Sequence, residues 1–157
     1  MEIAELIDEY AAGPQKLRDT IAGMTPEQID AAPVPGKWST RQVVCHLADF
    51  EPAYADRMKH VIAEDQPTFA GGFQKQFAEH LAYGERDIEE ELRLIDAVRS
   101  QMTRILRSLP SVAFERTGSH SVKDPMTLRT LLERITNHIP HHVQFIEEKK
   151  RTMESGA

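Results

Sequence analysis

Three things are scarce in this sequence: cysteine, long apolar runs and an excess of basic residues. Cys45 is the only cysteine, which excludes an intrachain disulfide and a thiolate-rich zinc site. No stretch approaches the roughly 18 apolar residues of a membrane-spanning helix. The formal net charge is −6, from 19 basic and 25 acidic residues, and no basic patch with interleaved aromatics is present. We therefore expect a protein without nucleic-acid or membrane partners.

The composition is that of an ordinary soluble globular protein. Hydrophobic residues make up 40% of the 157 residues and charged residues 28%. A chain of this length can bury a sizeable core without disulfides. The N-terminal residues lack the basic start and apolar run of a signal peptide, and the single cysteine fits a reducing compartment. These observations predict one domain, residues 1–157, in the cytoplasm.

Four long segments have the apolar periodicity of amphipathic helices, and none alternates convincingly like a strand. They span about residues 3–22, 39–62, 84–109 and 127–152. Capping boxes at Ser39 and Thr25 open the second long helix and a short extra helix, and Thr127 caps the last one. Four such helices with nothing else predict an all-α four-helix bundle, and two long connections argue against simple hairpins.

Prolines lie inside the predicted helices without ending their apolar pattern. Each proline removes one backbone hydrogen bond and crowds the carbonyl four residues earlier. The pattern continues past Pro52 and past Pro140, so we expect kinked helices there. Gly13-Pro14 should kink or split the first helix.

Three of the seven histidines fall on apolar stripes. His138 and His142 are four residues apart on the last helix, so their side chains lie ~40° apart on one face. His46 lies in the apolar stripe of the second long helix. Facing helices of a bundle can bring such groups together, and bundle cores hold metal sites of this kind.

Three neutral imidazoles suit a transition metal such as Zn²⁺ or Ni²⁺ better than Mg²⁺ or Ca²⁺. Three protein ligands also leave positions open for water or substrate. The pattern is not that of a zincin, because Ile139 stands where that motif needs glutamate. The alternative is that these histidines are structural and have hydrogen-bond partners in the core.

Two blocks around these histidines resemble the signatures of the DinB-like superfamily of YfiT-type proteins. The first is Pro35-Gly36-Lys37-Trp38-Ser39-Thr40-Arg41-Gln42-Val43-Val44-Cys45-His46-Leu47-Ala48-Asp49, and the second is His138-Ile139-Pro140-His141-His142-Val143-Gln144-Phe145-Ile146. They occur in the right order about ninety residues apart, which makes the resemblance more specific than one motif would. Similar segments elsewhere extend it over nearly the whole chain.

The resemblance implies a four-helix bundle with up-down-down-up connectivity and one metal ion, Ni²⁺ or Zn²⁺, held by His46, His138 and His142. It also implies a homodimer and a small-molecule substrate. Relatives include thiol S-transferases that use low-molecular-weight thiols and proteins named as metal-dependent hydrolases. The neighbouring His141 is a weak candidate for an acid–base group, with an imidazole turned off the ligand face as the alternative.

Other residues have simpler interpretations. We expect Trp38 to pack near Val43 as a helix staple and Cys45 to be a small core residue. Asp49 and Glu51 could support a ligand, but carboxylates on helices are usually solvated. Lys149-Lys150-Arg151 is interpreted as the basic end of the last helix.

Three functions remain open at the level of sequence. The first is a metal-dependent enzyme, with thiol transfer favoured because no zincin-type base is present. The second is a non-catalytic metal-binding or stress-associated bundle. The third is a helical interaction domain with buried histidines. Metal content separates the third from the others, and an open coordination position separates the first from the second.

Overall fold

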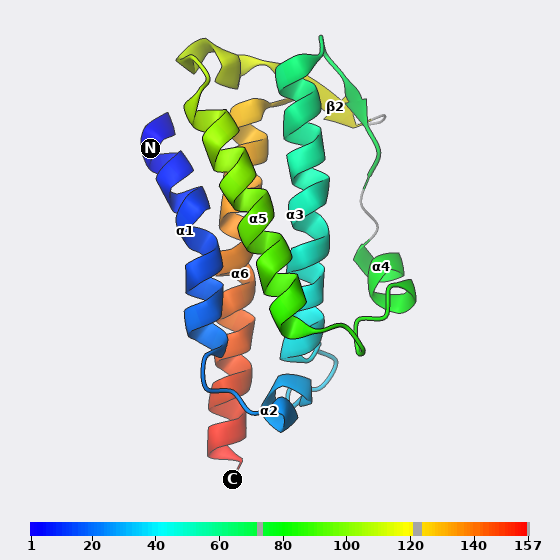
Figure 1. Cartoon of the computed structure of the whole chain (residues 1–157). Helices are drawn as coiled ribbons and strands as arrows, with labels where there is room; N and C mark the ends of the chain where they lie inside the picture. Colours follow the sequence, from blue (N-terminus) through cyan, green and yellow to red (C-terminus); the bar gives the residue numbers. More distant parts are fainter. Residues whose placement is uncertain (72–73, 121–123, 157) are drawn as a thin grey trace.

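The computed structural model describes residues 1–71, 74–120 and 124–156, and its main feature is a bundle of four long helices (Figure 1). These are α1 (Ile3–Ile21), α3 (Thr40–Ala63), α5 (Ile88–Arg107) and α6 (Leu128–Ser155). The short helices α2 (Pro26–Asp30) and α4 (Gln74–His80) and the 3₁₀ turn η1 (Ser111–Glu115) lie in the connections. The predicted four-helix bundle is thus confirmed.

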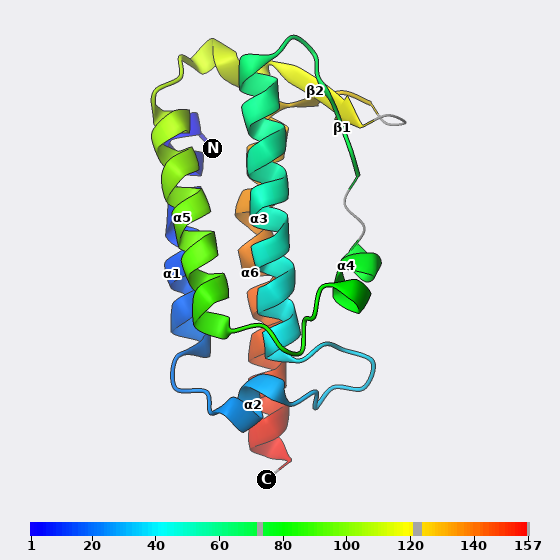
Figure 2. The same cartoon turned by 45° about the vertical axis from the view of Figure 1, so that its right-hand side comes forward.

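The helices have up-down-down-up connectivity, as the resemblance implied. The colours of Figure 1 show α3 and α5 running in one direction and α1 and α6 in the other. The helix α1 packs against α5 and α6, and α3 packs against the same two helices. Because α3 and α5 are parallel, the chain between them must return along the bundle, and α4 lies on this return path beside α3 (Figure 2).

Local side-chain chemistry explains where the helices begin. The Ser39 hydroxyl accepts a hydrogen bond from the Gln42 backbone N–H at 3.2 Å, and the Gln42 side chain accepts one from the Ser39 N–H at 2.8 Å. Thr127 caps α6 by accepting from the Thr130 N–H. The predicted start of α5 near residue 84 is too early, because Asp87 accepts from the Glu90 N–H and caps the helix there.

None of the interior prolines ends its helix. The helices α1, α3 and α6 continue through Pro14, Pro52 and Pro140. The predicted split of α1 at Gly13-Pro14 therefore does not occur. Gly13 is instead needed for packing, since a Cβ atom there would collide with the guanidinium of Arg99.

A small three-stranded sheet closes the end of the bundle where α3 ends (Figure 1). Its strands are β1 (Thr68–Phe69), β2 (Thr117–His120) and β3 (Met126–Thr127), in the order β1-β2-β3. The β1–β2 pair is parallel and the β2–β3 pair antiparallel. This corrects the expectation of helices alone, and the reason is length: two to four residues are too few for a detectable alternation.

Candidate metal centre

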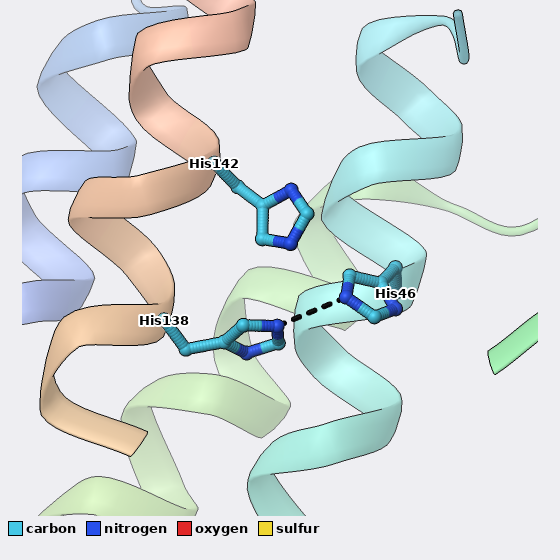
Figure 3. A group of neighbouring side chains, drawn as sticks. All are labelled: His46, His138 and His142. Atoms are coloured by element: carbon cyan, nitrogen blue, oxygen red, sulfur yellow. Dashed lines mark hydrogen bonds between the residues drawn. The ribbon is translucent and has the colours of Figure 1, made fainter. Parts of the chain in front are cut away.

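His46, His138 and His142 converge between α3 and α6. Figure 3 shows the three imidazoles pointing toward one another, one from α3 and two from successive turns of α6. The predicted stacking of His138 and His142 on one face holds because α6 continues through Pro140. His46 is buried, and the other two are half-buried. The core therefore closes the cluster on the side of His46, and a ligand can reach it on the side of the two half-buried histidines.

The three rings are in close contact. The Nε2 atoms of His46 and His138 are 2.9 Å apart, and the three ring centroids are 4.7–4.8 Å from one another. One nitrogen from each ring can be chosen so that all three lie within 4.8 Å. Two nitrogens that bind one ion at 2.0–2.1 Å must themselves be roughly 2.9–3.4 Å apart for octahedral to tetrahedral angles. The His46–His138 spacing meets this requirement.

The cluster is neutral near pH 7. Burial lowers the pKa of His46 to about 4, that of His138 to about 2 and that of His142 to about 3. The mutual repulsion of the three rings adds to the effect of burial at His138 and His142. A neutral imidazole keeps a free lone pair, which is the form that a metal ion needs.

The protein leaves several polar atoms of the cluster without partners. Among the described residues, nothing forms a hydrogen bond with the buried Nδ1 atoms of His46 and His138. A buried imidazole nitrogen without a hydrogen-bond partner lowers the stability of the fold. Structural histidines would need hydrogen-bond partners for these two Nδ1 atoms, and the described residues supply none.

Aromatic residues wall the cluster. The His46 ring lies 4.8 Å from that of Phe50 and 5.2 Å from that of Trp38, centroid to centroid. Phe77 of α4 packs on Phe50, so the return path between α3 and α5 covers this wall. His141 is exposed and lies outside the group of three, with its ring 5.0 Å from that of His142. It borders the cluster rather than joining it.

A pocket of about 220 Å³ opens directly beside His142. It is lined by residues from α6, from α4 and from the start of α3 with the segment before it: His142, Phe145, Lys149, Gln74, Val43, Gly36, Lys37 and Trp38. A larger groove of about 550 Å³ lies between α1 and α5, but none of the three histidines lines it. The smaller pocket therefore gives a ligand access to the cluster.

The expected packing of Trp38 and Cys45 is confirmed. Trp38 packs against the core cluster that contains Val43. Cys45 is buried, and burial raises the pKa of its thiol to about 11, so it is not a reactive thiolate.

Two interpretations of charged residues are wrong. Glu51 is not solvated: it is fully buried and forms a two-pronged ion pair with Arg99 of α5, at 3.0 and 2.6 Å. Asp49 is not simply solvated either: it accepts two hydrogen bonds from Arg86. The basic residues 149–151 do not form the last turn of α6, because the helix continues to Ser155, and Lys149 is buried. In the sequence, Lys149 lies one helical turn after Phe145 of the apolar stripe, and this spacing was the available sign that Lys149 is buried.

The fold and the cluster together define a helical-bundle protein with a three-histidine site. The chain belongs to the DinB superfamily, whose family model matches residues 9–146.

Known relatives span nearly the same length. The chain is 31% identical over 92% of its length to "Putative metal-dependent hydrolase OB0782" of Oceanobacillus iheyensis, of which it covers 83%. It is also 31% identical to "Putative metal-dependent hydrolase YfiT" of Bacillus subtilis, over 89% of this chain and 79% of that protein. The solved structure of Bacillus subtilis YfiT, described as "a probable metal-dependent hydrolase with an unusual four-helix bundle topology", superposes with a TM-score of 0.91. That match has 29% identity and covers 98% of this chain and 88% of YfiT. Within the described residues, no helix is long and apolar enough to cross a membrane.

Proposed function

We propose that the protein is a metal-dependent enzyme in which His46, His138 and His142 hold one divalent transition-metal ion, Ni²⁺ or Zn²⁺. The observation that carries this proposal is the convergence of three neutral imidazoles beside an open pocket. Three nitrogen ligands leave coordination positions for a water, a thiol or a substrate atom. An ion bound there would lower the pKa of such a nucleophile or polarise an electrophilic substrate.

The chain's own residues prepare the site for this chemistry. Burial keeps all three imidazoles deprotonated, so no proton must leave before a ligand bond forms. The aromatic rings of Trp38 and Phe50 pack against His46 and hold its imidazole in place. The pocket beside His142 leaves one approach for a small molecule.

We further propose transfer to a low-molecular-weight thiol as the reaction. Ile139 stands where a zincin has its catalytic glutamate, so the last helix supplies no general base of the zincin kind. A thiol needs only a lowered pKa to become a nucleophile, whereas attack by water benefits from a base. Hydrolysis is the second candidate, and the names of the relatives in Oceanobacillus and Bacillus favour it.

Metal content per chain tests the site. Untagged protein purified without chelator should contain near one ion per chain by elemental analysis. His46→Ala and His138→Ala should each lose it, because two remaining imidazoles hold an ion far less tightly. The matched control is His141→Ala, which removes an exposed histidine from the same helix and should keep the ion. Absence of metal after reconstitution with Zn²⁺, Ni²⁺ and Fe²⁺ would make the histidines structural.

Activity of the metal-loaded protein tests the reaction. With cysteine and 1-chloro-2,4-dinitrobenzene, the thiol sulfur should bond to the ring carbon, chloride should leave with its bonding electrons, and the thiol proton should pass to buffer. This rate should depend on the metal and vanish in His46→Ala. A 4-nitrophenyl ester assayed in parallel tests hydrolysis. A metal-loaded protein inactive towards several thiols and esters would support a non-catalytic metal-binding bundle.

A further inference from the structure

The pocket beside His142 contains two lysines and no balancing acid. Lys37 and Lys149 both line it, and none of the described residues that line it is acidic. This is unexpected in a chain with a net charge of −6. Charges of one sign gathered in a cleft raise the local concentration of ligands of the other sign.

Lys149 is the unusual member of the pair. Only 2% of its surface is exposed, and lysines are almost never fully buried unless paired. No carboxylate among the described residues forms an ion pair with it; the ammonium donates only to the Phe145 carbonyl one turn earlier, at 3.3 Å. A charge-assisted hydrogen bond is normally about 2.7–2.9 Å long. The positive charge of Lys149 is thus weakly compensated by the protein.

Burial lowers the pKa of Lys149; the negative charge of Glu148 acts against this, and the positive charge of Lys37 adds a smaller lowering. Glu148 forms no ion pair with Lys149 among those found in the described residues and does not line the pocket. An anion placed between the two lysines would relieve the repulsion between them and supply the missing partner.

The pocket also has aromatic walls, which suit an apolar part of a ligand. Trp38 and Phe145 line it together with the lysines, and the Lys37 ammonium lies 5.3 Å from the centre of the Phe145 ring. Aromatic walls with a few convergent polar groups are typical of small-molecule sites. Because His142 lines the same pocket, a molecule bound there contacts the metal centre at one end.

We propose that Lys149 and Lys37 form an anion subsite that binds a carboxylate of the substrate, while Trp38 and Phe145 hold its apolar part against the three-histidine centre. This inference rests on the proposed function, since it assigns the substrate class of that site: a small organic carboxylate with an apolar or aromatic body. Lys149 would orient the substrate and takes no part in bond breaking.

Trp38 supplies a direct probe, because it is the only tryptophan of the chain and lines the pocket. Its fluorescence can follow the binding of 3-phenylpropionate and of the neutral 3-phenylpropionamide, which has nearly the same shape. Both titrations are made on chelator-treated protein and on Zn²⁺-loaded protein. The metal-free arm matters because a carboxylate could also bind the ion directly.

The carboxylate should bind about tenfold or more tightly than the amide, with and without Zn²⁺, as expected for a hydrogen bond to a charged group. Lys149→Met keeps the length of the side chain and should abolish this preference. Lys37→Met should reduce it, and because Lys37 is exposed the variant retains the fold. The matched control Lys59→Met removes an exposed lysine from α3, away from the pocket, and should change nothing.

Two results would overturn the subsite. One is equal binding of carboxylate and amide to the metal-free protein. The other is a preference, with or without Zn²⁺, that survives both lysine substitutions, which would mean that the anion binds elsewhere or on the ion. The second result leaves the proposed metal-dependent function standing. Conversely, a Lys149-dependent preference in a protein that takes up no metal would support the subsite and reject the metal-dependent function.

Discussion

The bundle contains two polar clusters at its centre, and they differ in how far the protein itself satisfies them. Arg99 donates to both carboxylate oxygens of Glu51 and to the backbone carbonyls of Tyr10 and Ile135. These partners lie on α3, α1 and α6, so one guanidinium on α5 connects all four long helices. In the histidine cluster, the described residues form a single internal hydrogen bond, between His46 and His138, and leave two buried Nδ1 atoms without hydrogen-bond partners.

This difference separates a structural cluster from a functional one. A buried ion pair in which all three guanidinium nitrogens donate hydrogen bonds fixes the relative positions of the helices. Three neutral imidazoles with unused nitrogens contribute little to the fold but are available to a ligand. The Arg99 cluster is therefore expected to matter for stability without any ligand, and the histidine cluster mainly when a ligand is bound.

The largest effect is expected from breaking the Arg99 cluster. Glu51→Ala leaves the Arg99 guanidinium buried without its carboxylate, and should lower the free energy of unfolding by about 3–5 kcal/mol. Urea denaturation measures the change. The double variant Glu51→Leu with Arg99→Met removes both charges and should lose much less. If Glu51→Ala matches the double variant, the pair does not hold the bundle together.

The next effect concerns the histidine cluster and its ion. Zn²⁺ at a hundred times its dissociation constant should raise the free energy of unfolding by about 2.7 kcal/mol. His138→Phe should abolish this stabilisation while leaving the metal-free protein nearly as stable, since the ring is replaced by one of similar size. Urea denaturation with and without Zn²⁺ measures both free energies of unfolding. A large loss of stability in metal-free His138→Phe would mean that the histidine cluster, like the Arg99 cluster, stabilises the fold without a ligand.

Acid should distinguish the clusters as well. The pKa of His46 is about 4 in the fold and about 6.5 in an unfolded chain, so between these values the unfolded state binds more protons. Stability is unaffected above about pH 6.5 and falls as the pH drops towards 4. His46→Phe should remove about 1–2 kcal/mol of the loss between pH 7 and pH 5 in metal-free protein. His141→Phe, at an exposed position, serves as the control; an equal change there would contradict the assignment to His46.

The smallest effect is expected at an exposed ion pair of the same chemistry as Arg99–Glu51. Arg107 and Asp8 are 2.9 Å apart, with 57% and 71% of their side chains exposed. Asp8→Ala should change the free energy of unfolding by less than about 1 kcal/mol, because water screens the pair. A loss as large as that of Glu51→Ala would mean that burial is not what distinguishes the two pairs.

Much of the framework can be predicted from the sequence because it depends on local interactions. Ser39 and Thr127 cap helices through residues three positions away, and apolar periodicity assigns the core face of each long helix. Histidines on those faces are expected to point inward, and the resemblance to the DinB-like superfamily grouped His46 with the pair on α6. The short strands escaped prediction because two to four residues form no pattern and are held only by pairing with distant segments.

The sequence by itself determined the four long helices, the caps at Ser39 and Thr127 and the three inward histidines, since these follow from spacing along one helix. Only the tertiary structure decided that Glu51 is buried against Arg99, 48 residues away, and that Lys149 faces the pocket from within α6. The physical reason is that helical periodicity specifies a face but not its partner. A charged residue near the edge of an apolar face is solvated or buried according to what the neighbouring helix places opposite it.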